Sequence, residues 1–388
     1  MRHILPSRPL ILFRAYHSRT MSADTKPKRP PLTHFLCLPL VNDVSLPQLE
    51  CSLAAFKASI PQAPARSDLT EQQRRYQQPR PLIPDDAIRP VGTLHLTLGV
   101  MSLPTPERLN EALEFFQSLD LPSLLRAAGE IAAQKKLPEA TTTNGKPIDS
   151  ATNTAEVLIK SSIDEHSQCR STSPEPFAIS LESLHALPRA RSATILHAAP
   201  VDPTSRLYPF CEALREKFQE AGFMQKEYQR GSATKPRSLL LHATIANTIY
   251  IRGRKRNAGG HGKGRRPSQY TFDARDIVSH YRNFYLDSDR TVARSSAVTA
   301  SGDNYTNRDG AESHSEDEGA SAPPTSDDTY PSYPFIWARN LPIESVCICE
   351  MGAKKLDPDA DENGMNARLK EKYAAVAERS LTPGRGNC

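Results

Sequence analysis

Two short apolar stretches of the sequence carry the same polar pattern, His-x-Thr, and this pair restricts what the chain can fold into. The first stretch runs from Thr93 to Gly99 and the second from Leu240 to Ala246. Side chains i and i+2 of a β-strand lie on the same face of the sheet. Each stretch therefore predicts a strand with an imidazole and a hydroxyl on one face and aliphatic side chains on the other.

A phosphodiester substrate suits the four polar residues of these stretches, which are His95, Thr97, His242 and Thr244. One imidazole can take a proton while the other donates one, and the two hydroxyls can hold the phosphoryl oxygens. A single His-x-Thr is expected about once by chance among the 11 histidines, so only the matched pair is informative. The alternative is that each histidine is a structural residue of a sheet, hydrogen-bonded to its neighbouring threonine.

Further substrate contacts are predicted around the two motifs. The next residue on each polar face is small, Gly99 in one stretch and Ala246 in the other, and we expect both to leave room beside the imidazole. Lys235 and Arg237 precede the second strand and could contact a phosphate. Tyr250 follows it and could stack on a base if it faces the cleft; packing in the core is the alternative.

Several segments, in a fixed order, resemble the two-histidine (2H) phosphoesterases, also called the 2′-5′ RNA ligase-like superfamily. The chain is most similar to the branch that holds the A-kinase anchor protein nuclear-localisation domain and subunit 1 of the activating signal cointegrator complex. The matching segments are an opening strand, the two motifs, a middle strand pair and a closing strand, within residues 33–127, 177–286 and 335–353.

The resemblance implies an α+β fold with two mainly antiparallel sheets, related by pseudo-twofold symmetry around a central cleft, and helices outside. It implies a metal-independent phosphodiesterase without a cofactor, a phosphoric diester hydrolase that acts on 2′,3′-cyclic phosphates, 2′-5′ linkages or RNA 3′ ends. The alternative is a non-catalytic subunit that binds RNA or nucleotides in a cointegrator-type assembly, in transcription regulation or repair of alkylation damage. Intact motifs favour the enzyme, because a pure binder needs no matched imidazoles.

The composition limits the core to one domain of about 230 to 260 residues. The 388 residues include 33 prolines, only 38% are hydrophobic, and the mean hydropathy is −0.52. We expect a targeting or disordered segment at 1–30 and a domain at 31–353 with a tail at 354–388. Within the domain, segments poor in large apolar residues predict disordered insertions at about 129–175, 253–268 and 287–333.

Hydrophobic periodicity predicts the individual elements of this domain. Strands are expected at 33–41, 92–102, 177–184, 192–199, 238–249 and 337–351. Helices are expected at 46–59, 106–118, 121–128, 204–221 and within 272–286, where a strand follows, and in the tail at 366–380.

No sequence pattern calls for a metal, a disulfide framework or a membrane span. The seven cysteines include no Cys-x-x-Cys pair, which indicates free thiols in a reducing compartment. No run approaches the ~18 apolar residues of a membrane helix. We expect a monomeric domain that takes an RNA or nucleotide substrate, with room for protein partners. The basic stretch 252–266 could contact an RNA backbone, act as a nuclear signal or be a plain loop.

The N-terminal residues leave two destinations open. Residues 1–23 carry four arginines and no acidic residue, a composition typical of a mitochondrial presequence, although prolines interrupt the helix that it would need. Met21 is a second possible start, after which residues 26–30 form a short basic run of the nuclear-localisation kind. Translation from Met1 predicts the mitochondrial matrix, and translation from Met21 predicts the nucleus or cytoplasm.

Overall fold

The computed structural model describes residues 30–63, 80–136, 177–226, 228, 236–251, 269–294 and 333–381. The chain divides into two units, 1–31 and 32–388, and all described helices and strands belong to the second. The predicted N-terminal targeting segment and the basic stretch after the second motif lie outside the described residues. Within the described ranges, no helix is long and apolar enough to cross a membrane.

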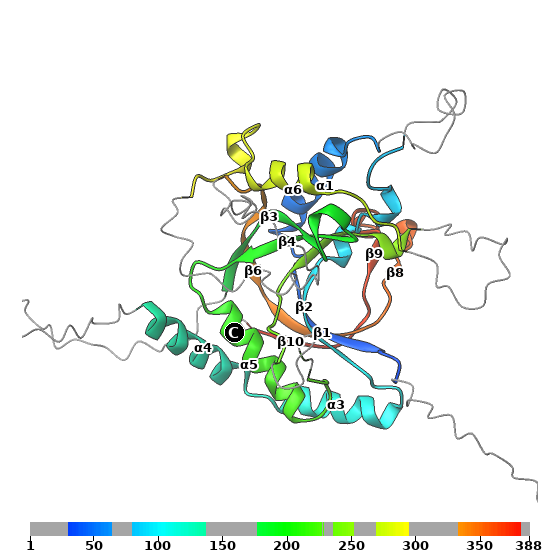
Figure 1. Ribbon diagram of the computed structural model, residues 1–388. Coiled ribbons are helices and arrows are strands. Elements are labelled where there is room, and N and C mark those ends of the chain that lie inside the picture. The colour runs from blue at the N-terminus through cyan, green and yellow to red at the C-terminus, as the bar shows by residue number, and fades with distance from the viewer. Residues whose placement is uncertain are drawn as a thin grey trace, which may run out of the picture. The chain divides into compact units, whose positions relative to one another are not determined.

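The second unit is built on a curved sheet of eight strands, in the order β10-β7-β1-β2-β5-β4-β3-β6 (Figure 1). Every pair of neighbouring strands is antiparallel. The strands are β1 (His34–Pro39), β2 (His95–Met101), β3 (Phe177–Leu187), β4 (Ile195–Val201), β5 (Ala243–Asn247), β6 (Ile336–Ile343), β7 (Ser345–Glu350) and β10 (Ala375–Ser380).

Two halves of four strands make up this sheet, and each half contains one motif strand at the junction. Strands β1 and β2 enclose helix α1 (Leu46–Ser59) in sequence, and β4 and β5 enclose helix α5 (Leu207–Glu220) in the same way. The halves meet at a single register pair, Leu96 with Ala243. The predicted α+β fold with pseudo-twofold symmetry is confirmed, and its two sheets are joined edge to edge into one.

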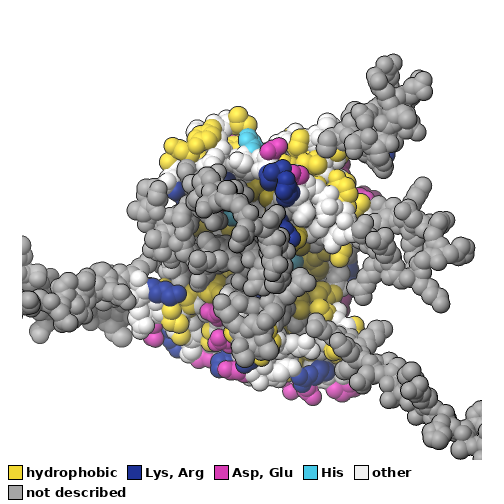
Figure 2. Space-filling view, in the orientation of Figure 1, with side chains coloured by type: hydrophobic (Ala, Val, Ile, Leu, Met, Phe, Trp, Pro, Cys, Tyr) yellow, Lys and Arg dark blue, Asp and Glu magenta, His cyan; other side chains and the backbone are white. Residues whose placement is uncertain are grey.

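Helices α1 and α5 cross over between the halves. Helix α1 packs on β6, and α5 packs on β2 and on α4 (Leu121–Lys136), while α6 (Arg275–Arg282) packs on β3. Figure 1 shows α1 and α6 toward one end of the unit and α3 (Pro106–Ser118), α4 and α5 toward the other. In Figure 2 basic and acidic side chains intermingle along this second end, where Arg108 pairs with Glu111 and Lys217 with Glu220.

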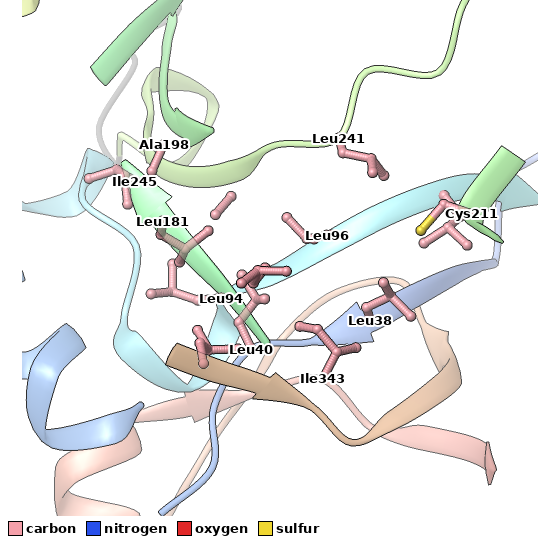
Figure 3. Close-up of a cluster of buried hydrophobic side chains, with 14 of the residues drawn as sticks. Leu38, Leu40, Leu94, Leu96, Leu181, Ala198, Cys211, Leu241, Ile245 and Ile343 are labelled. Carbon is pink, nitrogen blue, oxygen red and sulfur yellow. The ribbon is translucent and has the colours of Figure 1, made fainter. Parts of the chain in front are cut away.

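The main hydrophobic core lies on the face of the sheet that the helices cover, here called the core face. Leucines that alternate along β1 and β2 are almost fully buried there and meet aliphatic residues of β3 and β5 (Figure 3). Burying one such side chain contributes about 1.5 to 3 kcal/mol relative to leaving it exposed. The alternation that buries these leucines turns every second residue of β2 and β5 to the opposite face, here called the site face.

Helix α4 is longer than predicted, and this corrects the start of the first insertion. The sequence predicted a short helix at 121–128 and solvated chain from 129, but α4 continues to Lys136. Its buried residues Leu121, Leu125, Ala128 and Ala132 follow helical spacing. Two of these four positions are alanines. The prediction relied on large apolar residues, so it did not include this part of the buried stripe.

The tail belongs to the domain, and its predicted helix over 366–380 is wrong. Helix α7 covers only Met365–Leu369, and Ala375–Ser380 forms β10, which pairs with β7. Strand β10 supplies hydrogen-bond partners for the backbone groups on that edge of β7. This pairing within the fold outweighs the helix propensity of the segment. Two short strands, β8 (Lys354–Lys355) and β9 (Glu371–Lys372), precede β10 in the sequence and form a separate two-stranded sheet.

Two further predictions about the last third of the chain need correction. The insertion expected from residue 287 begins with ordered structure, since Thr291 pairs with Phe335 and Arg294 forms an ion pair with Glu182. The single strand expected at 337–351 is two strands, β6 and β7, separated at Glu344. No strand follows α6 within the described residues up to 294, where the sequence predicted one.

Candidate active site

The polar residues of both motifs lie on the site face, as predicted. Along β2, His95 and Thr97 are half-buried while the leucines between and after them are buried on the core face. Around the start of β5, His242 and Thr244 are likewise half-buried, and the aliphatic residues between and after them are fully buried. The alternation of polar and apolar residues therefore directs two imidazoles and two hydroxyls to one face.

The register between β2 and β5 crosses the two motifs. Leu96 pairs with Ala243 in an antiparallel ladder. One step to either side, His95 lies across from Thr244, and Thr97 lies across from His242. Residues opposite each other on one face of an antiparallel pair have Cβ atoms about 4.5 to 5.5 Å apart. The four polar side chains thus surround one gap between the halves.

Backbone carbonyls fix both imidazoles in the same tautomer. The Nδ1 atom of His95 is 2.8 Å from the carbonyl oxygen of Thr93, and that of His242 is 3.0 Å from the carbonyl oxygen of Leu240. A carbonyl oxygen only accepts, so each Nδ1 carries the proton and each Nε2 has a free lone pair. These contacts differ from the alternative, in which each imidazole is hydrogen-bonded to the hydroxyl of its neighbouring threonine.

Both threonine hydroxyls remain available. Within the described part of the chain, neither the Thr97 nor the Thr244 hydroxyl makes a hydrogen bond. A hydroxyl can donate one hydrogen bond and accept two. Each can therefore donate to a phosphoryl oxygen in the gap without giving up a partner among the described residues.

Burial keeps both imidazoles neutral at pH 7. It lowers the pKa of His95 to about 4, and the charge of Arg89 and that of His242, when protonated, act in the same direction. Burial, followed by the charge of Arg237, lowers the pKa of His242. In each case the hydrogen bond to the backbone carbonyl opposes the shift. An anion held between the two rings would raise both pKa values and favour one protonated imidazole.

The two sides of the site differ in chemistry. Next to Thr97 the site face carries thiols, because Cys37 lies opposite Thr97 and Cys347 lies opposite Cys37. Next to Thr244 it carries imidazoles, because His197 lies opposite Thr244 and His185 opposite His197. The pseudo-twofold symmetry therefore holds for the four motif residues and ends at their neighbours.

Aromatic rings surround His95 on the thiol side. The ring of Phe35 lies 4.9 Å from the imidazole, and the ring of Tyr373 stands edge-on to it at 5.1 Å. A cavity of about 160 Å³ lies beside these groups and is lined in part by His95, Cys37 and Tyr373. Sequence reasoning missed both aromatic residues. Phe35 follows from the alternation along β1, whereas no local pattern points to Tyr373.

A third imidazole adjoins His242 on the other side. The ring of His197 is 5.1 Å from that of His242 and 5.4 Å from that of His185. His197 is buried, and its Nδ1 has no hydrogen-bond partner among the described residues. Burial is the main cause that lowers the pKa of both His197 and His185, the latter to about 4. Their positions on the predicted middle strand pair did not suggest this placement.

The small residues after each threonine do not lie beside the imidazoles, contrary to prediction. Leu36 pairs with Gly99 and Cys37 with Thr97, so Leu98 is an extra residue in β2, a β-bulge. A matching bulge at Ile245 in β5 follows from the pairs of Leu196 with Ala246 and of His197 with Thr244. Both bulges turn the next residue to the core face, where Ala246 is buried.

At Gly99 the space is filled by a methionine. A Cβ atom added there would lie 2.5 Å from the sulfur atom of Met224. The absence of a side chain at Gly99 is therefore explained by core packing and not by room for a substrate.

The remaining predicted contacts are Lys235, Arg237 and Tyr250. Lys235 lies outside the described residues. Arg237 is exposed, and its carbonyl oxygen accepts a hydrogen bond from Arg215 at 3.3 Å. Tyr250 is 43% exposed and lies beneath the guanidinium of Arg89. Within the described ranges, no three His, Cys, Asp or Glu side chains are grouped to hold a metal ion.

Comparison with known proteins agrees with this geometry. A family model described as the AKAP7 2′5′ RNA ligase-like domain matches residues 32–294, which include both motif strands. No curated protein matches the chain at a significant level. The matched region covers more than half of the chain, and the chain therefore belongs to the AKAP7 branch of the 2′-5′ RNA ligase-like, two-histidine phosphoesterase family.

Proposed function

We propose that this domain is a metal-independent phosphodiesterase that cleaves RNA-type phosphodiesters by acid/base catalysis with two histidines. The observation that carries the proposal is the crossed register, in which each motif histidine faces the threonine of the other motif. A phosphate in the gap would have an Nε2 on either side and a hydroxyl next to each. This is the donor and acceptor set that in-line displacement at phosphorus requires.

The reaction needs one neutral and one protonated imidazole. The neutral Nε2 takes a proton from the nucleophile, which is water for a 2′,3′-cyclic phosphate and water or the adjacent hydroxyl for a 2′-5′ or 3′-5′ linkage. The nucleophile forms a bond to phosphorus, and the protonated Nε2 gives its proton to the leaving ribose oxygen as the old bond breaks. Hydrogen bonds from Thr97 and Thr244 stabilise the charge on the non-bridging oxygens.

The substrate itself helps to create the acid. Both imidazoles are neutral in the free protein, because burial lowers the pKa values of His95 and His242. A bound phosphodiester adds a negative charge between them and so favours protonation of one ring. The pseudo-twofold arrangement allows either histidine to be the base, and the direction in which a substrate binds decides which one it is.

The test uses the full chain in the presence of EDTA with three substrates: RNA that ends in a 2′,3′-cyclic phosphate, 2′-5′ oligoadenylate and a 3′-5′ oligonucleotide. The wild type is expected to cleave at least one, and His95→Ala and His242→Ala are expected to cleave none at a measurable rate. His280→Ala, on helix α6, is the matched control. Circular dichroism checks that each variant is folded.

Wild-type rates in both motif variants would refute two-histidine catalysis. If the wild type binds RNA but cleaves none of the three substrates, the non-catalytic binding subunit of a cointegrator-type assembly becomes the better account. The same substrate panel therefore separates the two functions.

A further inference from the structure

Arg89 is a buried cation that has no anionic partner among the described residues. It precedes the first motif by six residues, and only 6% of its surface is exposed. Among the described residues, no carboxylate lies within ion-pair distance of its guanidinium. A buried charge without a counterion is costly, so this arginine is expected to meet an anion that the described residues do not supply.

The surroundings of Arg89 hold the guanidinium in place without satisfying it. Its Cζ atom lies 3.9 Å from the ring centroid of Tyr250, in a cation–π contact. Its Nη2 donates a long hydrogen bond of 3.5 Å to the hydroxyl of Tyr373, and its backbone N–H donates to the carbonyl oxygen of Ile245 at 2.8 Å. Of the five guanidinium N–H groups, most thus have no acceptor in the described part of the chain.

Tyr373 connects this arginine to the catalytic cluster. Its hydroxyl accepts from Arg89, and its ring stands edge-on to His95 at 5.1 Å between centroids. The charge of Arg89 is also close enough to contribute to the lowered pKa of His95. An anion on Arg89 would thus lie one side chain, Tyr373, away from a phosphate held at His95.

A cavity of about 650 Å³ opens beside Arg89 and Tyr250. This volume lies within the range of about 300 to 1,000 Å³ that is usual for ligand pockets. Of the four other cations of its wall, Arg368 bridges to Glu50 at 2.6 Å and Lys57 lies 3.8 Å from Asp85, while Lys355 and Lys370 are both exposed. Arg89, which has no carboxylate partner among the described residues, is the cation of this wall whose charge acts on His95.

We propose that Arg89, held by Tyr250 and Tyr373, binds a second phosphate of the substrate, next to the one that is cleaved. The inference rests on the proposed function and makes it more specific: the preferred substrates carry a further phosphate on the His95 side of the scissile linkage. A guanidinium presents paired N–H donors that match phosphate oxygens, and an aromatic face on one side keeps its plane fixed.

Binding to a protein that cannot turn over tests the proposal independently of catalysis. In the His95→Ala/His242→Ala double variant, affinities are measured by calorimetry for the dinucleotide UpU and for its 5′-phosphorylated form pUpU. With Arg89 present, pUpU is expected to bind about 10- to 100-fold more tightly, the range for a hydrogen bond to a charged group. Adding Arg89→Gln is expected to bring this ratio close to one.

Matched variants separate a direct contact from a loss of structure. Arg368→Gln removes an arginine of the same cavity wall that is already paired with Glu50, and it is expected to keep the ratio. Arg89→Lys keeps the charge without the paired donors, and it is expected to give an intermediate ratio of the affinities for pUpU and UpU. This variant also tests the inference if Arg89→Gln fails to fold. The ³¹P resonance of the 5′-phosphate should shift on binding only when Arg89 is present.

Two outcomes would overturn the inference: equal affinity for UpU and pUpU in the parent variant, or an undiminished ratio after Arg89→Gln in a folded protein. The trinucleotide UpUpU separates an internal second phosphate from a terminal one. If the wild type cleaved no substrate, the proposed function would be contradicted but this inference would not. The ratio of the affinities for pUpU and UpU could still be measured.

Discussion

Leu96 and Ala243 form the register pair that joins the two halves of the sheet. Both side chains are fully buried on the core face, so their pairing fixes which residues meet on the site face. A slip of one residue would turn an entire strand over, and His95 and Thr97 would then point into the core. The catalytic cluster therefore depends on packing under the junction as much as on the motif residues.

Replacing Thr97 with valine should lower kcat by about 10²-fold, the scale of losing one donor to the transition state. Valine keeps the shape of threonine, and the hydroxyl has no partner within the described part of the chain. The melting temperature is therefore expected to change little. Thr97→Ser should retain most of the activity, and Thr244→Val should behave like Thr97→Val. Serine and valine variants that are equally impaired would contradict a role for the hydroxyl.

The pH dependence of kcat/KM should have its maximum below pH 6.5. Burial lowers the pKa of His95 to about 4 and also lowers that of His242, and catalysis needs one of the two rings protonated. The protonated fraction of the free enzyme falls as the pH rises above these values, so kcat/KM should fall toward alkaline pH. The bound phosphodiester raises the pKa of the acid, so the corresponding limb of kcat should lie at higher pH.

A substrate with a 4-nitrophenyl leaving group is the control for this profile, because nitrophenolate leaves without protonation. Its alkaline limb should be absent while that of a dinucleotide remains. A kcat/KM maximum above pH 7.5 for the dinucleotide would mean that neither histidine acts as the acid with a lowered pKa.

Stability should fall as the pH drops from 6.5 toward 4. The pKa values of His95 and His185 are lowered to about 4 in the folded protein, whereas both groups titrate near 6.5 when unfolded. In this window the unfolded state binds more protons, so the free energy of unfolding rises with pH and levels off above 6.5. Urea unfolding at several pH values measures the slope. His185→Gln should make it shallower, and an unchanged slope would contradict the assignment.

The sequence was sufficient for features that are encoded locally. Alternation along 93–99 and 240–246 predicted both motif strands and the face on which the four polar residues lie, because β-strand periodicity requires no knowledge of neighbours. Helices α1 and α3 were predicted with their observed bounds. Each starts near a proline in the first turn and has a regular apolar stripe.

Features that depend on contacts between distant segments were not predictable in this way. Tyr373 reaches His95 only because the tail returns to the sheet through β9 and β10, where the sequence favoured a helix. Arg89 comes from a connection without periodicity and is positioned by a backbone hydrogen bond to Ile245. The two bulges likewise arise from pairing with β1 and β4, and they reverse the direction expected for Gly99 and Ala246.

The bulge in β2 makes Gly99 a packing position, and a double-mutant cycle with Met224 tests this. A Cβ at Gly99 would lie 2.5 Å from the Met224 sulfur, so Gly99→Val should reduce the free energy of unfolding by about 1 to 3 kcal/mol, as overpacked cores do. In a Met224→Ala background the same change should cost less, because the side chain that it would meet is gone. Chemical denaturation of the four proteins gives the coupling energy, expected to be about 1 kcal/mol or more. If the effects of the two substitutions on the free energy of unfolding were additive, the side chain at position 99 would not contact Met224. It would then point to the site face, as the sequence predicted.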